Sequence, residues 1–114
     1  MSVSEAYKRR WQRAAYRVLG EFLKVDLPAV SWSIPVSGAL VGDVDSLTST
    51  PAEQRAAFAA WTQYLDADVM PERVDSDGVT RLYAKFWRHG DRDGVRGAIR
   101  ASIYPSMGDE EAAR

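Results

Sequence analysis

Few side chains in this 114-residue sequence could carry out chemistry on their own. It has no cysteine, which excludes disulfides, thiolate metal sites and a cysteine nucleophile. Its one histidine, His89, stands near Asp91 and Asp93, whose charges could raise its basicity for general-base catalysis. No serine–histidine–acid grouping or glycine-rich phosphate loop accompanies it. We therefore expect a polar loop histidine with no catalytic, metal or cofactor role, and enzymatic activity is the weakest interpretation.

Acidic pairs form a second candidate motif. Two of these pairs, Asp75 with Asp77 and Asp91 with Asp93, are followed directly by a glycine. A calcium loop would need further ligands, ending in a bidentate glutamate at its twelfth position, and neither segment has them. Aspartate and glycine are also common turn residues, because aspartate bonds its own backbone and glycine tolerates positive φ. The two motifs therefore predict turns.

The last predicted hairpin carries the best candidate surface. Apolar and polar residues alternate over 81–87 and 95–104, which is typical of half-buried strands. If the apolar residues face the core, the opposite face carries basic and aromatic side chains: Arg81, Tyr83, Lys85, Trp87, Arg96, Arg100 and Tyr104. Exposed aromatic rings are costly in a monomer, so we expect a partner to cover this face.

Three interpretations of this face stay open from the sequence. Two copies of the chain could meet through the rings with arginines around the rim, which would give a homodimer or a larger homo-oligomer. Basic groups between aromatic rings could instead bind single-stranded nucleic acid. The side chains could also simply pair across the strands. The leading hypothesis is a non-catalytic module that binds itself or another protein, and nucleic-acid binding is the alternative.

Charge is unevenly distributed along the chain, although the net charge is only −1. Residues 1–24 carry six basic and two acidic side chains, whereas residues 25–78 carry two basic and nine acidic ones. On the first predicted helix the basic side chains form an arginine ridge: Arg9, Arg10, Arg13 and Arg17. The ridge could extend a binding surface for phosphates or an acidic partner, or it could be the solvated face of an amphipathic helix.

The elements that must position these surfaces follow the order αββαββ. Helical periodicity covers residues 4–24, with Ser2 and Glu5 at capping-box spacing, and a second helix starts after Thr50. Alternation over 30–36 and 39–44 predicts a hairpin between them, and Pro35 places its first strand at a sheet edge. Two helices on one face of an antiparallel sheet give a two-layer α+β sandwich, and a permuted ferredoxin-like topology has this element order.

The two halves of this order also share a short similarity. Residues 13–16 (Arg-Ala-Ala-Tyr) match residues 55–58 (Arg-Ala-Ala-Phe) at an offset of 42. An internal repeat would make two αββ halves related by a pseudo-twofold axis. Chance similarity between alanine-rich amphipathic helices also explains the match and is the interpretation that we favour, although the sequence does not decide between the two.

Large apolar side chains lie on the inner side of every predicted element. We expect them to meet in one core, formed by Trp11, Phe22, Trp32, Ile34, Phe58, Trp61, Phe86, Ile99 and Ile103. One core predicts a single domain over residues 1–105, followed by a flexible acidic tail over 106–114. The longest apolar run, 56–61, is too short to span a membrane, and no secretory signal pattern is present, so we expect a cytoplasmic protein.

A diffuse pattern extends over most of the chain. Its members are Trp32, Ile34, residues 38–42 (Gly-Ala-Leu-Val-Gly), Arg55, Phe58, Trp61, Leu65, Gly78, Leu82, Ala84 and residues 99–104. In these residues the chain resembles small actinobacterial proteins of no characterised family, often of mobile or phage-derived origin. Arginine outnumbers lysine twelve to three, which indicates a GC-rich bacterial genome. The resemblance implies no activity, partner or site residue.

Overall fold

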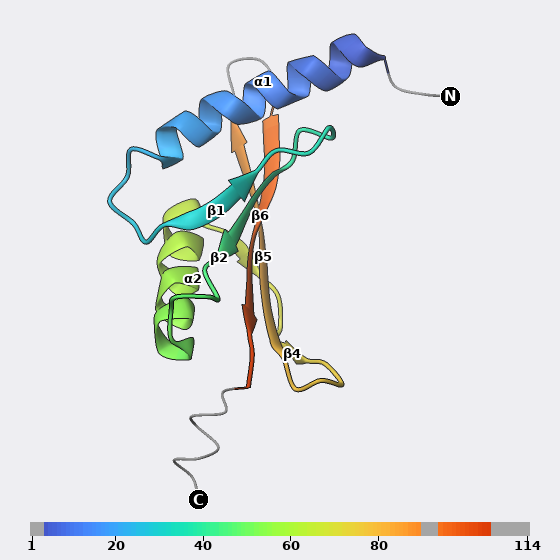
Figure 1. The fold of residues 1–114 in the computed structure, drawn as a ribbon. Helices are drawn as coiled ribbons and strands as arrows, with labels where there is room; N and C mark the ends of the chain where they lie inside the picture. The colour runs from blue at the N-terminus through green and yellow to red at the C-terminus, as the bar shows by residue number, and fades with distance from the viewer. Residues whose placement is uncertain (1–3, 90–93, 106–114) are drawn as a thin grey trace, which may run out of the picture.

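A computed structural model describes residues 4–89 and 94–105 of the chain (Figure 1). The elements in these residues are α1 (Glu5–Phe22), β1 (Val30–Ser33), β2 (Leu40–Val44), α2 (Pro51–Leu65), β3 (Asp68–Val69), β4 (Arg73–Val74), β5 (Thr80–His89) and β6 (Gly94–Ile103). The predicted αββαββ order is confirmed, with the short strands β3 and β4 added before β5. The tail predicted over 106–114 lies outside the described residues.

All of these strands join one mixed sheet. Its order is β1-β2-β6-β5-β3, and β4 also pairs with β5, so β1 lies at an edge as Pro35 predicts. The two long hairpin strands, β5 and β6, pair antiparallel over their whole length, as do β1 and β2. The α+β class and the two-layer arrangement are confirmed.

The sheet is not antiparallel throughout, because β2 and β6 run parallel. This pair corrects the predicted strand directions and departs from a permuted ferredoxin-like sheet, which is antiparallel throughout. The parallel pairing of β2 with β6 is also evidence against an internal repeat with pseudo-twofold symmetry. A twofold axis normal to the sheet would keep both helices on one face but would make β2 and β6 antiparallel.

Local capping signals place the two helices. The Ser4 side chain accepts a hydrogen bond from the Tyr7 amide at 3.4 Å, so Ser4 caps α1; the predicted cap, Ser2, lies outside the described residues. At α2 the predicted capping box is confirmed: the Glu53 amide donates to Thr50 Oγ1 at 3.1 Å, and the Thr50 amide donates to Glu53 Oε1 at 2.8 Å. That second bond lowers the pKa of Glu53.

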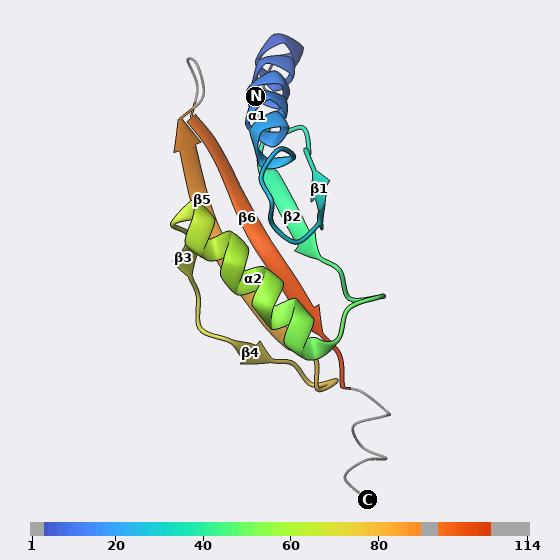
Figure 2. The ribbon, with the colours of Figure 1, turned by 90° about the vertical axis from the view of Figure 1, so that its left-hand side faces the viewer.

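The helices pack on the sheet from one side and one end. Helix α2 lies along the face of β5 and β6, while α1 crosses the end of the sheet (Figures 1 and 2). At the end of α1, Phe22 lies among Trp32, Trp61 and Phe86, with ring centroids 5.3–5.8 Å from its own. Phe22 and Trp61 are each only 2% exposed, which confirms the predicted meeting of the elements in one core.

Trp11 is the exception among the predicted core residues. It is half-buried and lies outside the core cluster, against the turn that joins β1 to β2. In that turn Gly38 has a φ of +78°, and a Cβ there would overlap the Cβ and backbone of Trp11. Trp11 therefore holds α1 against the hairpin turn.

Neither described helix combines the length and apolar character needed to cross a membrane.

Candidate interaction surface

The pairing of β5 with β6 separates the two faces of the sheet. Leu82, Ala84 and Phe86 are buried beneath the helices. The alternate residues point to the opposite side, where Tyr83 lies across from Arg100 and Trp87 across from Arg96. We call this side the open face; its members include Val41, Asp43, Asp68, Arg73, Arg81, Tyr83, Lys85, Trp87, Arg96, Ala98, Arg100 and Ser102.

Six of the seven residues predicted for the hairpin surface lie on the open face. The seventh, Tyr104, lies one residue beyond the end of β6 and is 53% exposed. Among the strand residues, Trp87 is 51% exposed and Tyr83 is 37% exposed. The predicted gathering of aromatic rings with basic side chains is therefore present within β5 and β6, and Tyr104 stands at its margin.

A shallow hollow of about 600 Å³ lies on the open face. Its apolar lining includes Val41, Tyr83, Trp87 and Ala98. Charged side chains of both signs also line it: Asp66, Asp68, Lys85 and Arg96. The two aspartates come from the end of α2 and from β3, where Asp68 lies opposite Lys85 in the pairing of β3 with β5. The hollow thus combines apolar lining residues with two acidic and two basic side chains.

Trp87 is held in place although half of it is exposed. Its indole lies over Gly94, where a Cβ would come within 2.5 Å of the ring, so only glycine leaves room for this stacking. The ring of His89 meets it edge-on, with the centroids 4.3 Å apart. Contacts on two sides restrict the motion of the indole while leaving its remaining surface open to a partner.

His89 itself has no catalytic setting in the described residues. It is the last residue of β5, paired with Gly94, and not part of the predicted loop. The imidazole is exposed and does not line the hollow beside Trp87. Asp91 and Asp93, the proposed modulators of its basicity, lie outside the described residues. The geometry of His89 gives the enzymatic interpretation no support.

Arg100 is neutralised by an aspartate on the neighbouring strand. Its Nε and Nη2 donate to the two carboxylate oxygens of Asp43, each at 3.0 Å. The two residues are register partners in the parallel pairing of β2 with β6. These hydrogen bonds raise the pKa of Arg100, so it stays charged but is already engaged. Alternation along residues 39–44 predicts that the Asp43 side chain points away from the core. The sequence does not show that β6 is the strand beside it.

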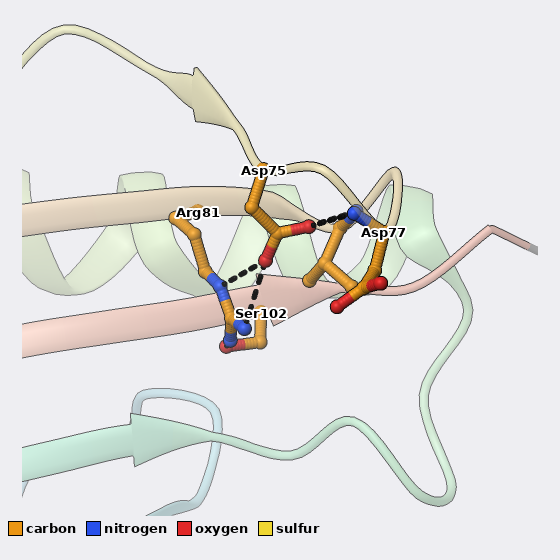
Figure 3. A network of polar contacts seen from close by, with 5 residues as sticks. Asp75, Asp77, Arg81 and Ser102 are labelled. Carbon is orange, nitrogen blue, oxygen red and sulfur yellow. Dashed lines mark hydrogen bonds and ion pairs between the residues drawn. The ribbon is translucent and has the colours of Figure 1, made fainter.

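Arg81 is engaged by the turn that precedes β5 (Figure 3). Asp75 Oδ1 accepts bonds from the amides of Asp77 and Val79 at 2.9 and 3.0 Å, which confirms the predicted turn chemistry. Asp75 Oδ2 accepts from Arg81 Nε and Nη2, and Arg81 Nη1 donates to Ser102 Oγ at 2.6 Å. The bond from the Val79 amide is the main cause that lowers the pKa of Asp75.

The four cations that β5 and β6 place on the open face fall into two groups. Arg81 and Arg100 are paired with carboxylates on or beside the same face. Lys85 and Arg96 form no ion pair with a residue in 4–89 or 94–105, and both line the hollow with Trp87.

Within the described ranges, no group of three or more histidine or acidic side chains could hold a metal ion.

The arginine ridge occupies a separate surface. All four arginines are exposed on the side of α1 opposite its buried stripe of Ala14, Ala15, Val18 and Phe22. Arg9 and Arg13 line their own hollow of about 350 Å³, together with Gln12, Tyr16 and Ile34. The arginine ridge and the open face are therefore two separate surfaces of the structure.

Comparisons of the chain with protein-family models, with curated proteins and with solved structures found no match.

Proposed function

We propose that this protein is a non-catalytic interaction module that self-associates through its open face, with Trp87 and Tyr83 at the centre of the contact. One observation carries the proposal: the Trp87 indole is fixed by Gly94 and His89, yet is 51% exposed beside an apolar hollow. Tryptophan, tyrosine and arginine dominate the energetics of protein interfaces. A fixed ring also loses little side-chain entropy when it binds.

Charge around the hollow favours a second copy of this chain as the partner. Asp66 and Asp68 line it together with Lys85 and Arg96, and Asp68 lies opposite Lys85. In a twofold dimer the same patch meets itself, so the acidic pair of each copy can face the basic pair of the other. Such complementarity guides the docking orientation more than it adds affinity.

The same charges disfavour nucleic acid as the partner of this face. Asp43 and Asp75 already neutralise Arg100 and Arg81, and the hollow beside Trp87 is lined by two further aspartates. A nucleic-acid strand laid across the rings would bring its phosphates close to these carboxylates. Protein association needs no net positive face, so it fits the charge balance better.

Sedimentation velocity across a wide concentration range tests the proposal. Wild-type protein should form a reversible dimer, and Trp87→Ser should weaken it by at least about 2 kcal/mol, or about 30-fold in Kd, as expected for a central interface tryptophan. Tyr83→Ser should act in the same direction. Tyr16→Ser is the matched control, because it removes an exposed ring from α1. Wild-type protein that stays monomeric at the highest concentration would refute self-association.

A charge-swap experiment tests the twofold arrangement directly. One variant carries Asp66→Lys and Asp68→Lys, and a second carries Lys85→Glu and Arg96→Glu. Each variant alone should be monomeric, because it places like charges against each other in a symmetric dimer. An equimolar mixture should form a heterodimer, since each altered patch then meets its complement. A mixture that stays monomeric while the wild type dimerises would place the contact elsewhere.

A further inference from the structure

A second hollow lies on the outer side of α1, away from the open face. Arg9, Gln12, Arg13 and Tyr16 line it from the helix, and Ile34 lines it from the segment after β1. Residues three and four positions apart are neighbours on a helix surface, so the two guanidinium groups and the phenol ring form one row. Gln12 Nε2 donates to the Ile34 carbonyl oxygen at 3.3 Å and ties the two walls together.

The two arginines of this hollow differ from Arg81 and Arg100 on the open face, which are paired with carboxylates. Neither Arg9 nor Arg13 pairs with a carboxylate among residues 4–89 and 94–105. The nearest acidic residue before them on α1, Glu5, binds Lys8 at 3.1 Å. Exposed guanidinium groups without a carboxylate partner can take phosphate oxygens in a bidentate manner. The hollow therefore offers two anion-binding groups about one helical turn apart.

The exposed ring of Tyr16 helps to distinguish between two classes of anionic partner, an acidic peptide and a nucleic-acid strand. Its side chain is 69% exposed, more than any other aromatic ring in the described residues, and it stands beside Arg13 in the same hollow. An acidic peptide would use the arginines but would gain little from the ring. Bases of an unpaired strand stack on aromatic side chains while cationic groups follow the phosphates. We infer that this hollow binds single-stranded nucleic acid, with phosphates on Arg9 and Arg13 and a base on Tyr16.

This site does not depend on the open face. It shares no lining residue with the hollow beside Trp87. Trp87→Ser should therefore leave strand binding unchanged, even where it abolishes self-association. Loss of binding in Trp87→Ser, with normal binding in an Arg9 and Arg13 variant, would place the strand on the open face and overturn the inference.

Fluorescence anisotropy with a labelled oligothymidine tests the inference at low salt. Wild-type protein should bind, and its affinity should fall steeply as salt is added, because bound phosphates release counterions. The double variant Arg9→Gln and Arg13→Gln should weaken binding at least tenfold and reduce the log–log salt slope by about 1.4, or about 0.7 for each lost phosphate contact. No binding by the wild type would end the inference.

Two controls separate a site from general attraction to positive charge. Arg10→Gln with Arg17→Gln removes the same charge from the same helix but changes no lining residue of the hollow. It should weaken binding less than threefold, and an equal loss in both double variants would refute a defined site. Polyglutamate should compete poorly; equal competition would show that the hollow does not distinguish a nucleic-acid strand from an acidic protein segment and would refute the inference.

The role of Tyr16 has its own readout. Tyr16→Leu keeps an apolar side chain of similar reach but removes the ring, so binding of oligothymidine should weaken about fivefold or more. Binding of an abasic strand, which has the phosphates without the bases, should be unchanged by the same variant. Equal effects on the two strands would show that the tyrosine does not stack on a base.

Discussion

Replacing Trp61 by alanine tests the architecture that supports both surfaces. Trp61 is 2% exposed, and its ring meets those of Phe22 and Trp32 at centroid distances of 5.8 and 5.3 Å. A buried tryptophan removes about 200 Å² from water, worth about 5 kcal/mol at about 25 cal/mol per Å², and alanine keeps a small part of that. We therefore expect Trp61→Ala to lower the free energy of unfolding by about 3–5 kcal/mol.

The indole nitrogen adds a smaller contribution that a second variant isolates. Trp61 Nε1 donates to the Pro28 carbonyl oxygen at 2.6 Å and so joins α2 to the segment before β1. Trp61→Phe keeps an aromatic ring but loses this donor, at a cost of about 0.5–1.5 kcal/mol for the hydrogen bond alone. Its stability should therefore lie between those of the wild type and the alanine variant.

Urea unfolding measures the loss of stability in both Trp61 variants. Far-ultraviolet circular dichroism is the probe, because the substitution would itself change the tryptophan fluorescence. For a domain of about 100 residues each kcal/mol moves Tm by about 4 °C, so Trp61→Ala should melt about 12–20 °C lower. All samples need one fixed concentration, since self-association shifts apparent stability. Tyr16→Ala, an exposed control, should stay within about 0.5 kcal/mol. An alanine variant that unfolds like the wild type would refute the one-core model.

Two further predictions concern the sheet and its turn. Gly97→Ala should destabilise the fold by about 1–3 kcal/mol, because its Cβ would overlap the Phe86 ring and the Leu40 carbonyl oxygen; an unchanged urea midpoint would contradict this close packing. The pKa of Asp75 is lowered from 3.8, chiefly by the Val79 amide, so its carboxylate stabilises the fold above about pH 4 and loses that effect as pH falls through the lowered pKa. The stability difference between wild type and Asp75→Asn should therefore shrink below pH 4, and a difference independent of pH would argue against the turn network.

Features encoded within a few residues were predictable from the sequence. The capping box of Thr50 and Glu53 needs only four consecutive residues, and it forms as expected. Alternation in 81–87 and 95–103 assigns each side chain to a face, because a strand has a period of two. The burial of Leu82 and Phe86, and the exposure of Trp87, follow from that local rule.

Features that depend on which strands are neighbours were not predictable. Alternation is the same for either strand direction, so it could not show that β2 and β6 run parallel. The partner of Arg100 is 57 residues away in the chain, and only the β2–β6 register brings Asp43 to it. Trp11 fits the apolar stripe of α1, but the helix crosses the end of the sheet, so that part of the stripe meets the Gly38 turn instead of the core.

The distribution of ion pairs, more than the number of basic residues, separates the two proposed surfaces. The sequence shows arginines on the last hairpin and on the first helix, and composition alone treats both as candidates for binding polyanions. On the hairpin, Asp43 and Asp75 neutralise two of these arginines, and the apolar hollow beside Trp87 is lined by charges of both signs. A surface of that kind fits the self-association that we propose for the open face. On the helix, Arg9 and Arg13 stand beside an exposed ring without a described carboxylate partner, and that arrangement suits a phosphate chain with bases.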